Sequence, residues 1–220
     1  MSQGGGMVCG PPACHLRGAP TRYQPISLGV ERYGSAKGRY SHYLHAQYSE
    51  AIVAMLACAR IGAIHSAVFA GFPVPALRGR IEDVCSKIAL IVDESVSGGK
   101  AIPMRRIVDE ALSMYDKDHL VQCLVLKRTG SPIPSPPGGS DHWWHGESAQ
   151  WPNYIAPEPM DSEDPLYLLY ISGSMGKPKG LLHSMTGYLL NLHPSDTMFC
   201  AGDVGWIAGN SYLVHVPLYE

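Results

Sequence analysis

The sequence predicts an α/β protein in which helices cover a mainly parallel sheet. Three short runs are mainly apolar, as expected for strands that are buried on both faces: Ile64–Phe69, Ile88–Val92 and residues 121–126. Between these runs lie segments whose apolar residues repeat with helical spacing. The turns that join the segments are short and contain glycine or proline. This alternation is typical of parallel strands joined by helical crossovers.

The first helix is expected to begin at Ser49, which can cap its N-terminus, and to end before Gly62 in the C′ position. Its predicted inward stripe consists of apolar residues at helical spacing, namely Ile52, Val53, Leu56 and Ala59. Residues 1–40 are rich in glycine and proline. We therefore expect residues 1–48 to be poorly ordered and residues 49–220 to form the folded domain.

Two more helices are predicted between the apolar strands. The first places Leu77, Ile81 and Val84 on one face, and the second, over residues 104–114, carries apolar residues at the same kind of spacing: Ile107, Val108, Ala111 and Leu112. In sheets of this kind ligands bind outside the carboxyl ends of the strands. The turns that follow Phe69 and Val92 are therefore candidate binding segments.

The composition favours a globular protein that does not bind nucleic acid through a basic surface. Of 220 residues, 45% are hydrophobic and 16% are charged, and the net charge is -2. No apolar run approaches the roughly 20 residues of a membrane-spanning helix, and no secretory signal is evident, so we expect a cytoplasmic protein. Cys9, Cys14 and His15 lack a second pair at zinc-finger spacing, so no metal site is expected.

Residues 166–183, LYLLYISGSMGKPKGLLH, place a polar loop between two apolar runs. Gly173, Gly176 and Gly180 allow backbone N–H groups to approach an anion, while Lys177 and Lys179 add positive charge. This composition favours a phosphate-binding loop, and an exposed flexible hairpin is the alternative. A kinase or ATPase P-loop is disfavoured, because the following Pro178 lacks an N–H group and opposes helical geometry at Lys177.

Residues 170–180 resemble the phosphate loop of the acyl-adenylate-forming enzymes, commonly written [YT]-T-S-G-S-T-G-x-P-K-G. Three further blocks resemble the AMP-forming acetyl-CoA synthetase family within that group: AMLACARIGAIHSAVFAGF (54–72), DESVSGGKAIPMRRIVDEAL (93–112) and DVGWIAGNSYLVHVPL (203–218). GSDHWWH and EPMDSEDPL are similar to the connection that precedes the loop. The likeness runs from about Ser49 to Leu218.

The resemblance implies ATP-dependent activation of acetate to acetyl-AMP and transfer of the acetyl group to coenzyme A. Mg²⁺ would accompany ATP, and coenzyme A would be the co-substrate. Lys179 matches the lysine of the PKG end and would act in catalysis. The implied ATP phosphate-binding residues are Ser172, Gly173, Ser174, Met175, Gly176, Lys177, Pro178, Lys179 and Gly180. Those implied for coenzyme A are Phe69, Gly71, Ser97, Gly98, Gly99 and Lys100, and those for the acetate pocket are Trp206 and Ala208.

The sequence departs from the family pattern at five positions, each of which removes charge or hydrogen-bonding capacity. Ile171, Met175 and Ala208 stand where threonine is usual, Ser97 replaces an arginine and Asn210 replaces a histidine. The family's ribose-binding acid and C-terminal lysine have no counterpart in these 220 residues. We therefore expect an adenylate-forming domain that is incomplete and inactive alone; the alternative is a non-catalytic chain that binds a full-length relative or a chaperone.

Some residues have two interpretations from the sequence alone. Trp206 without the resemblance is typical of a core residue. Asp203 could orient a neighbouring group or cap a turn. His65 and His183 are expected to be structural histidines whose polar atoms are satisfied.

Overall fold

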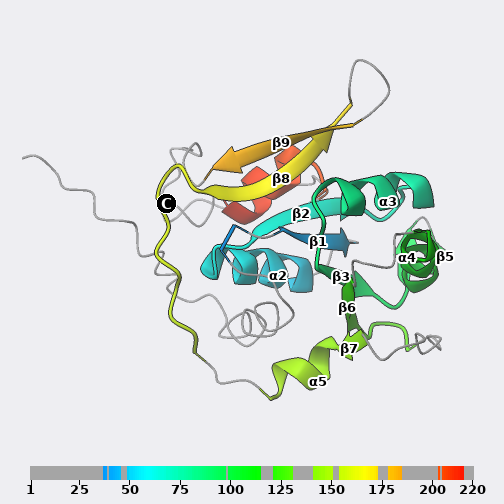
Figure 1. The fold of residues 1–220 in the computed structure, drawn as a ribbon. Coiled ribbons are helices and arrows are strands. Elements are labelled where there is room, and N and C mark those ends of the chain that lie inside the picture. Colours follow the sequence, from blue (N-terminus) through cyan, green and yellow to red (C-terminus); the bar gives the residue numbers. More distant parts are fainter. Residues whose placement is uncertain are drawn as a thin grey trace, which may run out of the picture.

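A computed structural model describes residues 37–38, 40–45, 49–97, 99–114, 121–130, 141–150, 154–172, 178–184, 203 and 205–215. The elements, labelled as in Figure 1, are β1 (Tyr40–His45), α2 (Ser49–Arg60), β2 (Ile64–Phe69), α3 (Val74–Asp83), β3 (Ile88–Val92), β4 (Ser95–Ser97), β5 (Lys100–Ile102), α4 (Met104–Ser113), β6 (Gln122–Leu126), β7 (Asp141–Trp143), α5 (Trp144–Ser148), β8 (Pro165–Ile171), β9 (Lys179–Ser184) and a π-helix, η1 (Gly209–His215).

In the described part of the chain, seven strands form one sheet in the order β7-β6-β3-β1-β2-β8-β9. Every neighbouring pair is parallel except β8 and β9, which form an antiparallel hairpin. The prediction of an α/β fold with a mainly parallel sheet is therefore confirmed. The strands β2 and β3 have the predicted bounds, and both pair with β1.

Strand β1 lies in the segment for which no element was expected. Its six residues pair with all six residues of β2, from Tyr40 with Ile64 to His45 with Phe69. The sheet therefore includes residues that precede Ser49. The other residues of the segment that was expected to be poorly ordered, 1–36, 39 and 46–48, lie outside the described residues, apart from the turn at 37–38.

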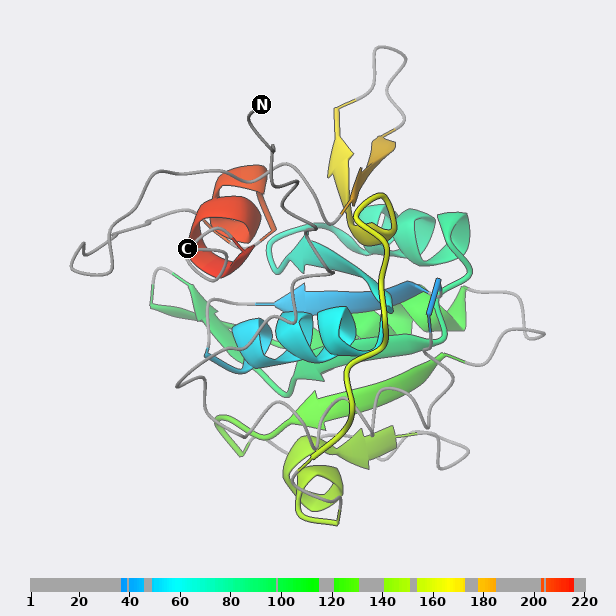
Figure 2. The ribbon, with the colours of Figure 1, turned by 90° about the vertical axis from the view of Figure 1, so that its left-hand side faces the viewer.

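Helices cover both faces of the sheet. In Figure 2, α2 lies in front of the central strands and α4 behind them, and α3 and α4 contact each other. This arrangement follows from right-handed crossovers, because the connection from β1 to β2 and the connections from β2 to β3 and β3 to β6 run in opposite directions across the sheet.

The predicted inward stripe of α2 is wrong. Its most deeply buried residues are small or flexible: Ala51, Ala54, Met55, Ala57 and Cys58, each 1% exposed or less. The predicted Ile52, Val53 and Leu56 are only partly buried at the edges of the core clusters. Small side chains let the helix lie close to the sheet, whereas the larger ones pack at its flanks, and η1 adds Val214 as a second partner of the helix.

The C-terminus of α2 agrees with the prediction for Gly62. This residue has a φ of 67°, and its N–H group donates to the Ala59 carbonyl (3.3 Å), while the Ala63 N–H group donates to the Cys58 carbonyl (3.0 Å). These two hydrogen bonds define a Schellman motif. A Cβ at this position would lie 2.6 Å from Met160 Sδ, so close packing also requires glycine.

The main core lies between the sheet and the helices. All five residues of β3 are buried, as are Leu77 and Ile81 of α3 and Val108 and Ala111 of α4. These four residues of the predicted faces of α3 and α4 are therefore buried, whereas Ile107 and Leu112 are partly buried against the core and Val84, which follows the end of α3, is partly buried. Trp144 also enters this core, whereas Trp143 is 49% exposed.

Candidate functional site

The ligand segments predicted from the sequence converge on one edge of the sheet where the structure describes them. Because β2, β3, β6 and β8 run parallel within the sheet, their carboxyl ends meet at the same edge. Phe69, Asp93 and Ser172 therefore belong to the edge at which ligands bind in open α/β sheets.

The β8–β9 hairpin presents the predicted phosphate loop. Ile171 pairs with Lys179 and Tyr170 with Gly180, so the strands close directly at the base of the loop. Ser172, Pro178 and Lys179 are exposed. A Cβ on Gly180 would lie 3.1 Å from Leu168 Cδ1, so this glycine permits close packing across the hairpin. The remaining predicted loop residues, Gly173, Ser174, Met175, Gly176 and Lys177, lie outside the described residues.

Phe69 ends β2 and is followed by a tight turn that needs a glycine. A Cβ on Gly71 would lie 2.3 Å from Phe69 Cε1, so any larger residue would displace the phenyl ring. The Phe72 N–H group donates to the Phe69 carbonyl (3.1 Å), and the two rings meet edge to face at 5.9 Å. Phe69 remains 37% exposed, which leaves part of its ring available to a ligand.

The second predicted coenzyme A segment is the β4–β5 hairpin. Ser97 pairs with Lys100 across a two-residue turn, and Gly99 has a φ of 75°, which suits the primed turns of tight hairpins. Lys100 is exposed. Gly98 and the side chain of Ser97 lie outside the described residues.

Asp93 fixes the root of this hairpin. Its carboxylate accepts hydrogen bonds from the backbone N–H groups of Glu94 (2.8 Å), Arg128 (3.0 Å), Thr129 (3.2 Å) and Gly130 (2.9 Å), and from the Thr129 hydroxyl (3.4 Å). Burial raises the pKa of the Asp93 carboxyl, but the backbone donors outweigh burial and hold that pKa below its ordinary value.

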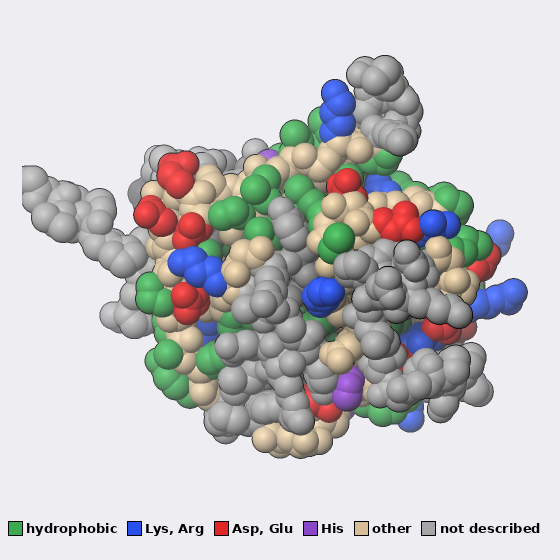
Figure 3. Space-filling model, in the orientation of Figure 1, with side chains coloured by type: hydrophobic (Ala, Val, Ile, Leu, Met, Phe, Trp, Pro, Cys, Tyr) green, Lys and Arg blue, Asp and Glu red, His purple; other side chains and the backbone are tan. Residues whose placement is uncertain are grey.

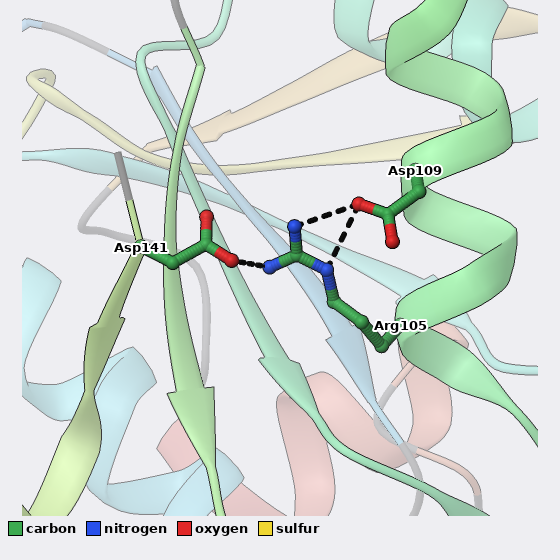
Figure 4. A network of polar contacts seen from close by, with 3 residues as sticks. All are labelled: Arg105, Asp109 and Asp141. Atoms are coloured by element: carbon green, nitrogen blue, oxygen red, sulfur yellow. Dashed lines mark hydrogen bonds and ion pairs between the residues drawn. The ribbon is translucent and has the colours of Figure 1, made fainter. Parts of the chain in front are cut away.

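Arg105 lies at the other end of the segment that contains the β4–β5 hairpin. Its N–H group donates to the Asp93 carbonyl (3.3 Å) at the start of α4. Its buried guanidinium pairs with Asp109 on the same helix (2.7 and 2.9 Å) and with Asp141 on β7, as Figure 4 shows. The two ends of the segment 94–104 are therefore joined by the hydrogen bond between Arg105 and Asp93.

Asp203, Gly205 and Trp206 belong to a turn that lies against the Phe69 segment. The Gly205 N–H group donates to Asp203 Oδ1 (2.7 Å) and the Trp206 N–H group to the Asp203 carbonyl (2.9 Å), so Asp203 caps the turn. A Cβ on Gly205 would lie 3.0 Å from the Phe69 backbone nitrogen. The segment with the predicted acetate-pocket residues therefore contacts the predicted coenzyme A segment, and Trp206 and Ala208 are both exposed, Trp206 by 58%.

His65 and His183 belong to a buried aromatic cluster. Tyr167 stacks between His183 (4.5 Å between ring centroids) and His215 (5.4 Å), and His65 lies 5.6 Å from both Tyr167 and His215. Burial lowers the pKa of each histidine, to about 4 for His215. His215 lowers the pKa of His65 further, and a hydrogen-bond interaction of the His65 ring with the Asn210 side chain, which favours the protonated imidazole, opposes this. Burial and ring stacking fit a structural role for His65 and His183, whereas the expectation that their polar atoms are satisfied stays a prediction.

Sequence analysis missed Arg80, which lies beside the base of the phosphate hairpin. Its guanidinium carbon is 4.4 Å from the centroid of the Phe72 ring and 5.1 Å from that of Tyr170. The Tyr170 hydroxyl donates to Asp83 Oδ2 (2.7 Å). Burial lowers the pKa of Arg80, while Tyr170 raises it. Only the position of Arg80, one residue before Ile81 on the inward face of the predicted helix, could have indicated its burial.

Comparison with protein families shows to which family the sequence belongs. The model of the AMP-binding enzyme family matches residues 44–220. The chain belongs to this family. The acetyl-coenzyme A synthetase of Penicillium chrysogenum is 51% identical over 179 residues, which cover 77% of this chain and 26% of that protein. Acetyl-coenzyme A synthetase 1 of Candida albicans is 51% identical over 204 residues, which cover 88% of this chain and 30% of that protein.

The fold agrees with that of a solved structure. Acetoacetyl-CoA synthetase from Streptomyces lividans superposes with a TM-score of 0.78 at 22% identity, and the match covers 90% of this chain and 31% of that chain. This confirms the predicted fold of an adenylate-forming enzyme. The chain spans between a quarter and a third of the length of the relatives that it matches.

Two further observations concern expectations from composition. None of the helices in the described ranges combines the length and apolar character that crossing a membrane requires. The described side chains include no group of three or more His, Cys, Asp or Glu placed to hold a metal ion. Cys9, Cys14 and His15 lie outside the described residues.

Proposed function

We propose that the chain provides part of the site of an AMP-forming acetate–CoA ligase. In the first step a carboxylate oxygen of acetate forms a bond to the α-phosphorus of ATP, and pyrophosphate leaves. In the second step the sulfur of coenzyme A bonds to the acetyl carbon, AMP leaves, and the thiol proton is released. The proposal rests on the family of the chain and on its relatives, which are named acetyl-coenzyme A synthetases.

The observation that carries the proposal is the closure of the β8–β9 hairpin at the ligand edge of the sheet. The pair of Ile171 with Lys179 starts the loop at the carboxyl end of a buried strand, where backbone N–H groups can turn toward an anion. We assign Lys179 to the phosphates of ATP, because it is exposed at the base of this loop. Lysine binds phosphate as a point charge, and such a contact contributes about 1.5–3 kcal/mol.

Mg²⁺ fits this site as a companion of the nucleotide. Among the described loop residues, Ser172 and 178–180, the Ser172 hydroxyl is the one side-chain oxygen. Mg²⁺ retains water and binds readily through the phosphates of a substrate. When bound with ATP, the ion would neutralise phosphate charge, and Lys179 would hold the phosphates in place.

Coenzyme A and acetate are assigned to the neighbouring segments. Phe69 offers an exposed ring for stacking on the adenine of coenzyme A, and Lys100 offers a positive charge to its phosphates. Trp206 and Ala208 would line the acetate pocket. The turn at Gly205 supports this assignment, because it contacts the Phe69 backbone and thus brings the acetate and coenzyme A segments together.

Binding measurements test the assignment of the loop. Titration of the purified protein with Mg-ATP should show that Lys179→Ala lowers the affinity by about 10- to 100-fold, as expected for a lost contact of 1.5–3 kcal/mol. Lys127→Ala is the matched control, because Lys127 is also exposed and follows the carboxyl end of β6. Lys100→Ala should lower the affinity for coenzyme A and leave that for Mg-ATP unchanged. Equal Mg-ATP affinity of the wild-type and Lys179→Ala proteins would refute the assignment.

A further inference from the structure

Arg80 is a buried cation whose described contacts contain no carboxylate. The residue is 7% exposed, and one guanidinium nitrogen donates to the Ala76 carbonyl (2.7 Å) one turn earlier in α3. Two aromatic rings, of Phe72 and Tyr170, lie within 5.1 Å of the guanidinium carbon. Buried arginines usually pair with acids, so the rings provide the main compensation for this charge.

The first ring belongs to the proposed coenzyme A segment. Phe72 ends the turn that starts at Phe69, and its N–H group and its ring both contact Phe69. Gly71 lacks the Cβ that would collide with the Phe69 ring. A ligand that moves Phe69 would therefore move Phe72, which lies against Arg80.

The second ring belongs to the base of the phosphate hairpin. Tyr170 is the penultimate residue of β8, pairs with Gly180 on β9 and precedes Ser172 by two residues. Its ring lies against Arg80, and its hydroxyl donates to Asp83. Helix α3 thus holds the hairpin base by the face of this ring and by its hydroxyl group.

We propose that Arg80 is a positioning residue that couples the coenzyme A segment, residues 69–72, to the base of the phosphate hairpin, residues 170–172. The guanidinium contacts one ring from each segment and so fixes the position of the two segments relative to each other. Occupation of one segment then changes the affinity of the other. The coupling of ligands rests on the function proposed above, whereas the coupling of the two segments is a property of the described contacts.

The positive charge, rather than the aliphatic stem, carries this role. Arg80→Met keeps a flexible apolar stem and removes the charge, whereas Arg80→Lys keeps a stem and a charge that can lie against both rings. Tyr170→Phe keeps the ring and removes the hydrogen bond to Asp83. Arg78→Met is the matched control, because Arg78 is on the same helix but is only half-buried and pairs with Glu82 (2.5 Å).

Hydrogen exchange of the 220-residue protein without ligand tests the coupling of the segments. Arg80→Met should raise the exchange rates of amides in residues 69–72 and 168–172 together by about threefold or more, in line with the loss of a desolvated cation–π contact. Arg80→Lys and Arg78→Met should stay close to wild type, and Tyr170→Phe should raise exchange in residues 168–172 alone. Unchanged exchange in Arg80→Met, or an equal rise in Arg80→Met and Arg80→Lys, would overturn the proposal.

Titrations with Mg-ATP in the presence and absence of coenzyme A form the second arm. In wild type each ligand should change the affinity of the other by fivefold or more, and Arg80→Met should bring this factor close to one while Arg80→Lys preserves it. Coupling that survives in Arg80→Met would contradict the proposal. If the wild-type protein binds neither ligand, the proposed function fails, and the exchange measurement alone then decides whether Arg80 couples the two segments.

Discussion

Asp93 illustrates how a single carboxylate can order a ligand segment to which it does not itself belong. Four backbone N–H groups and one hydroxyl donate to it, from the segments that follow β3 and β6. We predict that Asp93→Asn lowers the free energy of unfolding by about 1.5–3 kcal/mol, because an amide offers one acceptor oxygen to these donors. Urea denaturation followed by tryptophan fluorescence measures this loss, and Glu110→Gln, on the exposed face of α4, is the control.

The same carboxylate predicts a loss of stability in acid. Its pKa in the folded protein lies below the ordinary value, so its contribution is present above about pH 4 and is lost as the pH falls through the folded pKa. Asp93→Asn should therefore flatten the acid limb of a plot of stability against pH. An acid limb identical to that of the wild type would show that other carboxylates dominate it.

The histidine cluster predicts a second pH dependence at a higher pH. Burial lowers the pKa of His215 from 6.5 to about 4, so the unfolded chain binds a proton between these values that the folded protein does not. Stability should be independent of this group above pH 6.5 and should fall by roughly 3 kcal/mol as the pH drops toward 4. His215→Phe, which keeps a ring against Tyr167, should reduce this slope, and His145→Gln, at an exposed position, should not. The midpoint of thermal unfolding between pH 4 and 7 measures both.

At the scale of elements, sequence patterns located the buried strands well. Strands β2 and β3 have the predicted bounds because β3 is continuously apolar, β2 ends in the apolar run 67–69, and both strands are followed by turn residues. Strand β1, YSHYLH, was missed because polar residues interrupt it, although it pairs on both sides within the sheet. The three-residue strands β4 and β5 have too few residues for a periodic signal. The strand conformation of β1, β4 and β5 depends on pairing with residues distant from each strand's own local pattern.

The candidate site likewise has features that could be predicted from the sequence and features that could not. The two strands that flank the predicted phosphate loop and the turns at Gly62 and Gly71 could be predicted, because local backbone geometry selects their residues. The contact of Arg80 with Tyr170 could not, because 90 positions separate the two residues and no repeat or motif joins them. The burial pattern of α2 was misjudged for a related reason, since the size of facing side chains determines how closely a helix approaches a sheet.

Strand β9 ends the sheet and carries exposed apolar side chains. Leu181 and Leu182 are 44% and 50% exposed, and in Figure 3 hydrophobic side chains gather along the protruding hairpin. Edge strands of this kind tend to pair with other chains. We predict that the purified protein associates with increasing concentration and that Leu182→Lys lowers this association several-fold. Light scattering measures it, and Val96→Lys, at a 50% exposed position on β4, is the control. A monodisperse wild-type protein would contradict the prediction.

At the scale of the whole molecule, the parallel sheet brings segments that are far apart in the sequence to one edge. The turn after β2, the hairpin after β3 and the loop after β8 all leave the sheet at the carboxyl ends of its strands. The Gly205 turn joins them through its contact with Phe69. This common edge, in a chain that belongs to the AMP-binding enzyme family, is the basis for placing ATP, coenzyme A and acetate next to one another.

Lysine footprinting tests the placement of ATP most directly. The protein is treated with an amine-acylating reagent with and without saturating Mg-ATP, and mass spectrometry reads the modification of each lysine. We expect Mg-ATP to lower the acylation of Lys177 and Lys179 several-fold and to leave the acylation of Lys37 and Lys127 unchanged. Equal modification of Lys179 with and without Mg-ATP, in a protein shown by titration to bind the nucleotide, would contradict it.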